Sequence, residues 1–354
     1  MPSMLAQGGL EHETLFQLPQ SFFKWNHEGK HNMFVLGLQG SPRKKGNTRF
    51  LLSKFLEEAQ RQGAITQMIE VCQKKIDPCM EYVLCEKKGI CPIDDDMKHE
   101  IYPLLRKADV IVAATPIFFY NTTAQLKALI DRTQTLWARK YKLHLTDPNR
   151  KWRRGYTLAV GATRGKNLFE GLHLTMKYFY DAVGAEYVGS LAYREIEKPG
   201  DMERHETMGA DIQAAVKTLL EPFQGRKKIL FACRDNACLS QMAGAFAQIH
   251  AGNKLDVLIA GSQPAEKLNA LMVEAMQERG IDMGFRRTAS INTVMTAEKP
   301  ERVISMGRDC DVTVPDNIPQ EFWDFAEPGD LNAMRRIRDA VETKVIAFID
   351  RTFL

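Results

Sequence analysis

From position 33 onward, short apolar runs typical of strands alternate with longer amphipathic runs typical of helices, and this alternation restricts the fold more than any other feature. Strands are expected at 33–39, 66–71, 109–114, 156–161 and 186–193, and helices at 47–62, 97–107, 123–136, 167–183 and 203–221. The runs 110–114 and 156–160 are apolar without alternation, as in strands buried on both faces. Five strand–helix repeats predict an α/β fold with a doubly wound, five-stranded parallel sheet, whose ligands bind at the carboxyl ends of the strands.

The composition is that of an ordinary globular protein. The chain has 354 residues, enough for roughly two domains, of which 44% are hydrophobic and 26% charged, with a formal net charge of +4. No apolar run reaches the roughly 18 residues of a membrane-spanning helix, and the first 32 residues lack the apolar core of a secretory signal. Seven cysteines, an odd number, fit a reducing compartment better than a disulfide framework. We therefore expect a cytoplasmic protein that binds neither membranes nor nucleic acid.

Basic residues are concentrated in one segment, since seven of them lie between Arg139 and Arg154. Such a concentration could favour an anionic partner, and it is a weak hint of a site for the extra phosphate of NADPH. We favour the plainer interpretation, which is a solvated loop.

Composition and breaker residues divide the chain into three parts. Residues 1–32 precede the first strand pattern and are expected to form an extension outside the folded core, with the true start at Met1 or Met33 left open. A segment with Pro and Gly breakers at 221–225 then separates the five repeats from a second strand–loop–helix pattern. We expect one domain at 33–222 and a smaller α/β domain, also with a parallel sheet, at 226–354.

A polar loop at 40–48 joins the first strand to the first helix. A helix that begins near Asn47 has unpaired N–H groups and a positive dipole end, which together attract a phosphate monoester. Ser41, Asn47 and Thr48 add side-chain donors, and Arg43 or Lys44 could add charge from the rim. The glycine spacing fits neither the Walker loop nor the dinucleotide fingerprint. Phosphate binding and ordinary helix capping both remain open for this loop alone.

Two further loops are expected at the same edge of the sheet, at 115–123 and 161–165. Residues 116–120 offer apolar and aromatic surface to a flat heteroaromatic ring, and Gly161 and Gly165 allow its close approach. The alternative is that Phe118 and Phe119 simply cap the sheet.

Several motifs in this order resemble the NAD(P)H-dependent FMN reductase family of flavodoxin-like proteins. The motifs lie at 40–48, 91–97, 115–120 and 125–132, within a resemblance that covers about 33–195. The resemblance implies noncovalently bound FMN, reduced by NADH or NADPH, with electrons passed to a small-molecule or protein acceptor such as a quinone, a flavin or a metal. It also implies a possible homodimer. The residues that it assigns to FMN are Ser41, Arg43, Asn47 and Thr48 at the phosphate, and Pro116, Ile117, Phe118, Phe119, Thr163 and Gly165 around the ring system.

Cysteines follow the second predicted strand, where related iron–sulfur flavoproteins carry a compact cluster motif. Here Cys79, Cys85 and Cys91 are present, but Tyr82 stands where the second cysteine of that motif would fall. Three widely spaced thiolates fall short of the four that a cubane cluster takes, and Cys72 is the one further candidate. We expect Cys72 to be a buried thiol at a strand end. We favour a turn without a cluster.

The second half resembles the low-molecular-weight phosphotyrosine phosphatases and thioredoxin-coupled arsenate reductases over about 226–350. The matching stretches lie at 228–247, 259–264, 278–283, 303–306 and 323–328. Cys233 opens the loop after a strand, where amides and a helix N-terminus would lower its pKa and make it a nucleophile.

Several positions depart from the pattern of that superfamily. The arginine that grips the oxyanion is replaced by Leu239, and the flexible glycine two residues after the cysteine is Asp235. The acid before proline is Glu327, and of the two resolving-cysteine positions one is Arg308 and the other Cys310. Loss of the arginine alone should cost at least about a thousandfold in rate. We expect a domain that is inactive as a phosphatase.

The resemblances together predict an NAD(P)H-dependent FMN oxidoreductase fused to a phosphatase-like domain. Two alternatives remain open. One is a non-enzymatic redox sensor or docking protein, and the other is a flavin-coupled, arsenate-type thiol reductase that uses Cys233 with Cys238 or Cys310.

Overall fold

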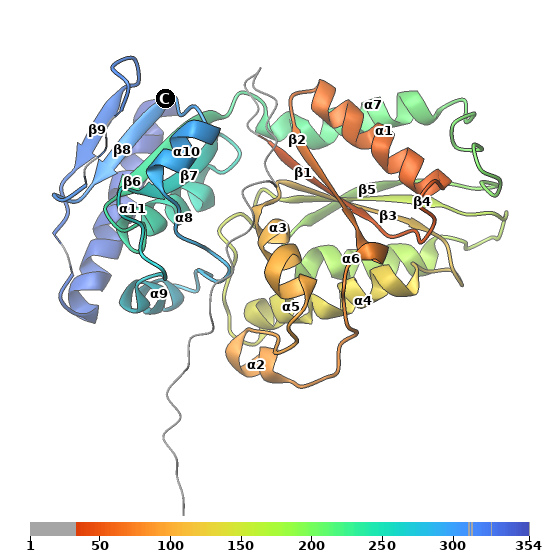
Figure 1. Cartoon of the computed structure of the whole chain (residues 1–354), viewed down its shortest axis with the longest axis horizontal. Helices are drawn as coiled ribbons and strands as arrows, with labels where there is room; N and C mark the ends of the chain where they lie inside the picture. Colours follow the sequence, from red (N-terminus) through yellow and green to blue (C-terminus); the bar gives the residue numbers. More distant parts are fainter. Residues whose placement is uncertain (1–32, 311, 313, 327, 354) are drawn as a thin grey trace, which may run out of the picture.

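The computed structural model describes residues 33–310, 312, 314–326 and 328–353, and the expected extension at 1–32 lies outside this range. Two parallel sheets form the framework (Figure 1). The first contains β1 (Phe34–Gln39), β2 (Ile65–Glu70), β3 (Val110–Pro116), β4 (Arg154–Val160) and β5 (Glu186–Tyr193). Its order, β2-β1-β3-β4-β5, is that of a flavodoxin-like sheet, so the predicted fold class is confirmed.

Helices cover both faces of this sheet (Figure 1). One face carries α1 (Asn47–Arg61) and α7 (Met208–Leu220), and the other carries α3 (Tyr102–Lys107), α4 (Ala124–Arg132), α5 (Gln134–Tyr141) and α6 (Glu170–Ala182). Alternate strand residues enter the two cores, because successive side chains of a strand point to opposite faces. Val110 and Val112 pack in the core under α1 and α7, whereas Ile111 and Ala113 pack under α3 to α6.

The second sheet has four strands: β6 (Lys227–Cys233), β7 (Leu255–Gly261), β8 (Arg302–Met306) and β9 (Gln320–Trp323). Their order is β7-β6-β8-β9, and every neighbouring pair is parallel. The larger of its two cores lies between the sheet and three helices, α8 (Leu239–Ala251), α9 (Ala270–Gln277) and α11 (Leu331–Phe353). The short helix α10 (Ile291–Ala297) covers the smaller core on the other face. The exact boundaries between the two domains stay a prediction.

Several helices differ in extent from their predictions. The helix expected at 123–136 is two helices, α4 and α5, which break at Thr133, where the hydroxyl donates to the Ile130 carbonyl at 2.6 Å. The predicted helix 97–107 begins with a π-helical turn, Met97–Ile101, before α3. A short helix, α2 (Leu84–Lys88), and a 3-10 turn, Val71–Gln73, lie in the connection after β2. A last 3-10 turn, Glu221–Phe223, leads into β6.

The two sheets meet at the ends where their strands begin (Figure 1). Asp109, which precedes β3, pairs with Arg226, which precedes β6, at 2.9 Å. The Trp152 indole, just before β4, donates to the Gln248 carbonyl near the end of α8 at 2.8 Å. Thr146 forms an isolated β-bridge with Ile281. The carboxyl ends of the two sheets therefore point away from each other.

The basic segment 139–154 is not the solvated loop that its composition favours. Arg139 and Arg153 are buried, and they pair with Asp282 (2.7 Å) and Asp147 (2.6 Å). The sequence alone could not show this, because Asp282 is 143 positions from Arg139.

Two further cations of this segment are also paired within the molecule. Lys140 and Arg150 both contact the Asp181 carboxylate of α6, at 2.6 and 3.1 Å. These four cations are therefore engaged by carboxylates of the chain itself.

Candidate functional sites

The loop after β1 leads into an uncapped helix. Gly46 precedes α1, no side chain of the described residues caps it, and the first turn contains no acidic residue. Ser41 and Thr48 are buried, 6% and 2% exposed, while Arg43 lies at the exposed rim. The Ser41 hydroxyl accepts the Arg43 N–H at 3.2 Å and can still donate, so the hydroxyls and the first amides at this helix end provide the donors that a phosphate monoester requires.

The Asn47 side chain is engaged differently from what the sequence predicts. Its Nδ2 donates to the Lys198 carbonyl at 2.8 Å, and its Oδ1 accepts from the Met202 N–H at 3.2 Å. The side chain thus ties the start of α1 to the loop after β5, and both of its polar atoms are used in doing so. The role predicted for Asn47 at a phosphate would fall mainly to its backbone amide.

Gln39 is a residue that sequence reasoning missed. It ends β1, it is 0% exposed, and its Oε1 accepts the Ser41 N–H at 2.6 Å. Its Nε2 has no hydrogen-bond partner among the described residues. A buried donor without a partner, directly below the loop, is a group that a bound polar ligand could satisfy. A glutamine at the end of an otherwise apolar strand was the available signal.

The aromatic loop after β3 ends in a tight turn. The Phe118 and Asn121 backbones exchange two hydrogen bonds, of 2.9 and 3.0 Å, and the two residues between them have positive φ, +46° at Phe119 and +62° at Tyr120. Aromatic residues rarely adopt this conformation, and such strain is concentrated at functional sites. The turn leaves the Phe119 side chain 102% exposed and Phe118 48% exposed. Pro116 ends β3, and Ile117 donates its N–H to the Val160 carbonyl of β4 at 2.9 Å.

The three predicted loops come together at the carboxyl edge of the sheet. The Thr123 hydroxyl donates to the Gly40 carbonyl at 2.6 Å and joins the first loop to the second. A Cβ atom at Gly165 would lie 3.1 Å from the Tyr120 hydroxyl and 3.7 Å from Thr163 Oγ1, so the third loop touches the second at a position with little room for a side chain. Arg194, which the sequence did not indicate, donates to the Gly165 carbonyl.

The cysteine segment is anchored by a buried ion pair. Arg132 of α4 binds both oxygens of Asp95 (2.5 and 3.1 Å) and donates to the Asp77 carbonyl at 2.8 Å. This pair holds the chain on either side of the three cysteines against the first domain.

The three cysteines of this segment differ in exposure. Cys79 is exposed, whereas Cys85 and Cys91 are half-buried. Burial, with smaller effects from the Cys91 and Cys79 thiols, raises the pKa of Cys85. Within the described residues, no group of three His, Cys, Asp or Glu side chains is arranged to hold a metal ion.

Cys72 is not the fully buried thiol expected from the sequence. It lies in the 3-10 turn after β2 and is half-buried, and its thiol donates to the Gly40 carbonyl at 3.5 Å.

In the second domain, Cys233 ends β6 and opens the loop that leads to α8. Its Sγ lies 3.0 Å from Ser240 Oγ and 3.4 Å from Asp235 Oδ1, and the same Asp235 oxygen accepts the Ala237 N–H at 2.9 Å. The Asp235 carboxylate therefore accepts a hydrogen bond from the Ala237 amide, one of the loop amides beside the sulfur. Asn236 adopts φ +52°, and its side-chain amide donates to Ser240 Oγ at 2.8 Å.

The prediction that Cys233 has a lowered pKa is wrong. The residue is 3% exposed, and burial raises the pKa of its thiol. The Asp235 charge raises the pKa further, and hydrogen bonds from Ser240 and the Asn236 backbone compensate only partly. The helix α8 begins only at Leu239, and among the described residues no side chain caps it.

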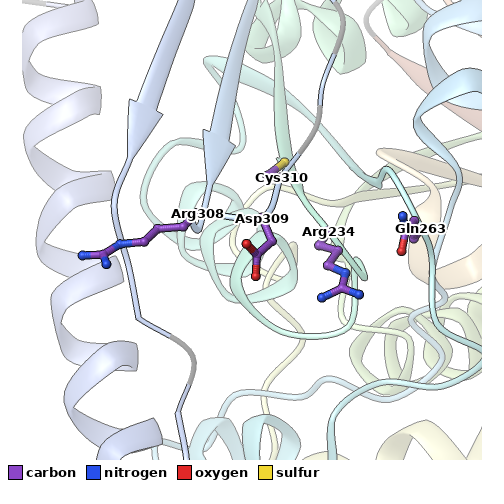
Figure 2. Close-up of a pocket in the computed structure, with 5 residues that line it drawn as sticks. All are labelled: Arg234, Gln263, Arg308, Asp309 and Cys310. Carbon is purple, nitrogen blue, oxygen red and sulfur yellow. The ribbon is translucent and has the colours of Figure 1, made fainter.

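An open pocket with a volume of about 640 Å³ lies beside this loop (Figure 2). It is lined by Arg234, Gln263, Arg308, Asp309 and Cys310. Arg308 points away from the other four side chains, toward Asp324, with which it pairs at 3.1 Å. Cys310, which we expect at the second resolving-cysteine position, thus lies at the pocket, while Glu327 lies outside the described residues.

Leu239 has become part of the hydrophobic core. Its side chain is 7% exposed and packs in the core of the second domain. A Cβ atom at Gly307 would lie 3.2 Å from its Cδ1. The residue expected at the arginine position of the superfamily is therefore a packed alkyl group, which offers no donor to an oxyanion.

Comparisons with known proteins find one family match within a stated range and two groups of relatives. The family model described as NADPH-dependent FMN reductase matches residues 33–193. An iron-sulfur flavoprotein of Methanosarcina thermophila is 36% identical over 132 residues, which are 37% of this chain and 65% of the relative. One from Methanocaldococcus jannaschii is 38% identical over 104 residues, 29% of this chain and 53% of the relative. The chain thus spans between about half and two thirds of the length of these flavoproteins.

A second group of relatives consists of arsenate reductases. Arsenate reductase 1 of Staphylococcus epidermidis is 30% identical over 131 residues, which are 36% of this chain and 98% of the relative. A solved arsenate reductase in the phosphate binding state is 28% identical and covers 35% of this chain and 98% of its own, with a TM-score of 0.32.

The fold and the two sites define a two-domain α/β protein that joins a flavodoxin-like sheet to a smaller sheet with a cysteine loop. The chain belongs to the arsenate reductase family, and it also carries a domain of the NADPH-dependent FMN reductase family at residues 33–193. Among the helices that the structure describes, none has the length and apolar character needed to cross a bilayer.

Proposed function

We propose that the chain is an NAD(P)H-dependent FMN oxidoreductase that passes electrons to a separate small-molecule or protein acceptor. The observation that supports this most directly is the meeting of three loops at one edge of the first sheet, through the Thr123–Gly40 hydrogen bond and the close approach of Tyr120 to Gly165. The family match at 33–193 supports the flavin and the nicotinamide reductant.

The residues present fit a flavin mononucleotide. The uncapped start of α1, with Ser41 and Thr48, would hold the phosphate, and the unpartnered Gln39 amide lies below the same loop. Bound FMN supplies the hydride chemistry, so the protein's task is to orient the ring and leave one face open to reductant and acceptor. The exposure of Phe118 and Phe119 is consistent with such an open face. The residues that would border the ring system are Pro116, Ile117, Phe118 and Phe119 on one side, and Thr163 and Gly165 on the other.

The test is spectroscopic. The purified full chain should show the absorbance bands of bound flavin, or acquire them with added FMN, and these bands should bleach anaerobically with NADH or NADPH. Steady turnover with a quinone would favour the enzyme over a non-enzymatic redox sensor. A colourless protein that takes up no FMN would overturn the proposal.

For the second domain we propose that phosphatase and arsenate reductase chemistry are lost. Leu239 removes the oxyanion-binding arginine, Asp235 occupies a loop amide, and the Cys233 thiol has a raised pKa. Turnover of an aryl phosphate, or of arsenate with thioredoxin, should lie at least about a thousandfold below that of an intact family member. Comparable turnover that disappears in Cys233→Ser would contradict this.

A further inference from the structure

A loop of the second domain contacts two arginines of the first domain. Asp282, which follows α9, has a side chain 1% exposed, and it pairs with Arg139 of α5 at 2.7 Å and with Arg106 of α3. Its Oδ1 also accepts the Gly284 N–H at 2.8 Å. Burial alone would raise the pKa of this carboxyl, but the two guanidiniums and the amide hold the pKa well below its usual range. A buried carboxylate is tolerated only with such complete pairing.

The residues that follow Asp282 complete the contact. The Phe285 ring lies against both cations, with its centroid 5.8 Å from the Arg106 guanidinium carbon and 5.5 Å from that of Arg139. Gly284 lies so close to Arg139 that a Cβ atom there would overlap the guanidinium. The segment 282–285 is therefore shaped around these two arginines, and we call it the interdomain latch.

The latch belongs to a wider network at the edge where the strands begin. Arg106 also pairs with Asp147 at 3.0 Å, and Asp147 pairs with Arg153 at 2.6 Å. The Arg226–Asp109 pair lies at the same edge. Buried charges on both sides of this interface would lose partners if the domains separated, so the network fixes the relative position of the two sheets.

This position places the two candidate sites at opposite ends of the molecule (Figure 1). The proposed flavin loops follow the carboxyl ends of β1, β3 and β4, and the Cys233 loop follows that of β6. Two such strands laid end to end, at about 3.3 Å per residue, separate the loops by on the order of 40 Å. Reduction of a disulfide by a reduced flavin requires contact between the two groups. The reacting atoms must come within about 3.5 Å of each other.

We propose that Asp282 is a positioning residue that holds the domains with their sites facing apart, so that the flavin crevice and the Cys233 loop serve separate partners. Any electron exchange between them then takes place between two molecules. In such an exchange the reduced flavin would give two electrons to a disulfide, which with protons becomes two thiols while the flavin is oxidised. The electron-transfer part rests on the proposed function, whereas the geometric part does not.

The first experiment measures how electron transfer depends on concentration. The full chain is loaded with FMN, oxidised with diamide, and then reduced anaerobically with NADPH. Absorbance follows the flavin, and alkylation with peptide mass mapping follows the Cys233 thiol at the same time points. We expect either no thiol formation or a rate that falls in proportion to dilution. Thiol formation at a rate unaffected by dilution would overturn the proposal.

The second experiment tests the latch itself and needs no flavin. Asp282→Asn keeps the shape of the side chain but removes the negative charge that Arg139 and Arg106 share. We expect the 221–226 linker to be cleaved by a protease at least about tenfold faster than in the wild type, with a larger radius of gyration in solution scattering. The matched control is Asp339→Asn, which removes a carboxylate that is 54% exposed and pairs only within the second domain, with Arg279 at 3.3 Å and Arg338 at 2.8 Å, so the domain contact should behave as in the wild type.

The two experiments separate the ways in which the proposals can fail. Absence of flavin binding would overturn the proposed function, while the protease and scattering comparison would still decide the geometry. If Asp282→Asn does not fold, scattering from the wild type decides. A scattering curve that fits one fixed arrangement of the two sheets supports the proposal, and a curve that requires two mobile domains overturns it.

Discussion

Thr48 and Ser41 are almost fully buried, although both are hydroxyl residues in a polar loop. Thr48 lies in the first turn of α1, where backbone amides have no intrahelical partner. A buried hydroxyl at such a position is suited to hold an anion rather than to face water. Asn47, in contrast, uses its side chain to bind the loop after β5, so neighbouring residues with similar chemistry have different roles.

We predict that Thr48→Val weakens FMN binding with little effect on folding. The substitution keeps the volume and removes one hydrogen bond to the phosphate, so the dissociation constant should rise by about tenfold, equivalent to about 1–2 kcal/mol. Fluorescence titration with FMN measures this change. Thr218→Val, an exposed threonine of α7, is the control and should leave the affinity unchanged. Equal affinities of Thr48→Val and wild type would remove Thr48 from the site.

At the scale of elements, β4 packs against α6 through a contact that only glycine allows. A Cβ atom at Gly155 would overlap the Tyr180 ring, which is 0% exposed. The ring has no freedom to move, since its hydroxyl donates to the Tyr156 carbonyl and accepts the Ala113 N–H at 3.2 Å. The pairing of β4 with β5 also shifts register between Gly155 and Tyr156.

Gly155→Ala should therefore destabilise the chain by about 1–3 kcal/mol or more, as overpacking of a rigid core does. Gly209→Ala serves as the matched control, because nothing lies within 4 Å of the added methyl group and the residue is exposed in α7. That change should be neutral or stabilise by up to about 1 kcal/mol through helix propensity. Urea titrations of both variants provide the comparison, and equal midpoints would contradict the packing argument.

At the scale of the whole molecule, charged residues gather where the domains meet. The Asp256 carboxylate of β7 lies 3.5 Å from Lys228 Nζ. The carboxylates of Glu298 and of Asp109, which belongs to the first domain, are near enough to affect it. Burial raises the pKa of Asp256 to about 6. Lys228 and Arg226 lower this pKa, and the Glu298 and Asp109 carboxylates raise it. The folded chain therefore binds a proton here at pH values where the unfolded chain has released it.

The sign of the resulting pH dependence follows from linkage. Because the folded pKa of about 6 exceeds the unfolded value of about 4, Asp256 makes folding less favourable as the pH rises through this interval. Asp256→Asn removes the effect, so the stability of the variant relative to wild type should increase between about pH 4 and pH 7. Denaturant titrations across this range test it, with Asp350→Asn as a surface control. A stability difference that is constant with pH would contradict the assignment.

The sequence by itself determined the parallel α/β fold and the position of the three loops, because strand alternation, helix starts and motif spacing depend on residues that are close in the chain. Only the tertiary structure decided that Arg139 and Arg153 of the basic segment are buried in ion pairs, that Cys233 is buried with a raised pKa, and that the two sites face apart. These properties depend on partners such as Arg139 and Asp282, which lie 143 positions apart. Burial and charge pairing arise when distant segments pack together, and no local pattern specifies which segments will meet.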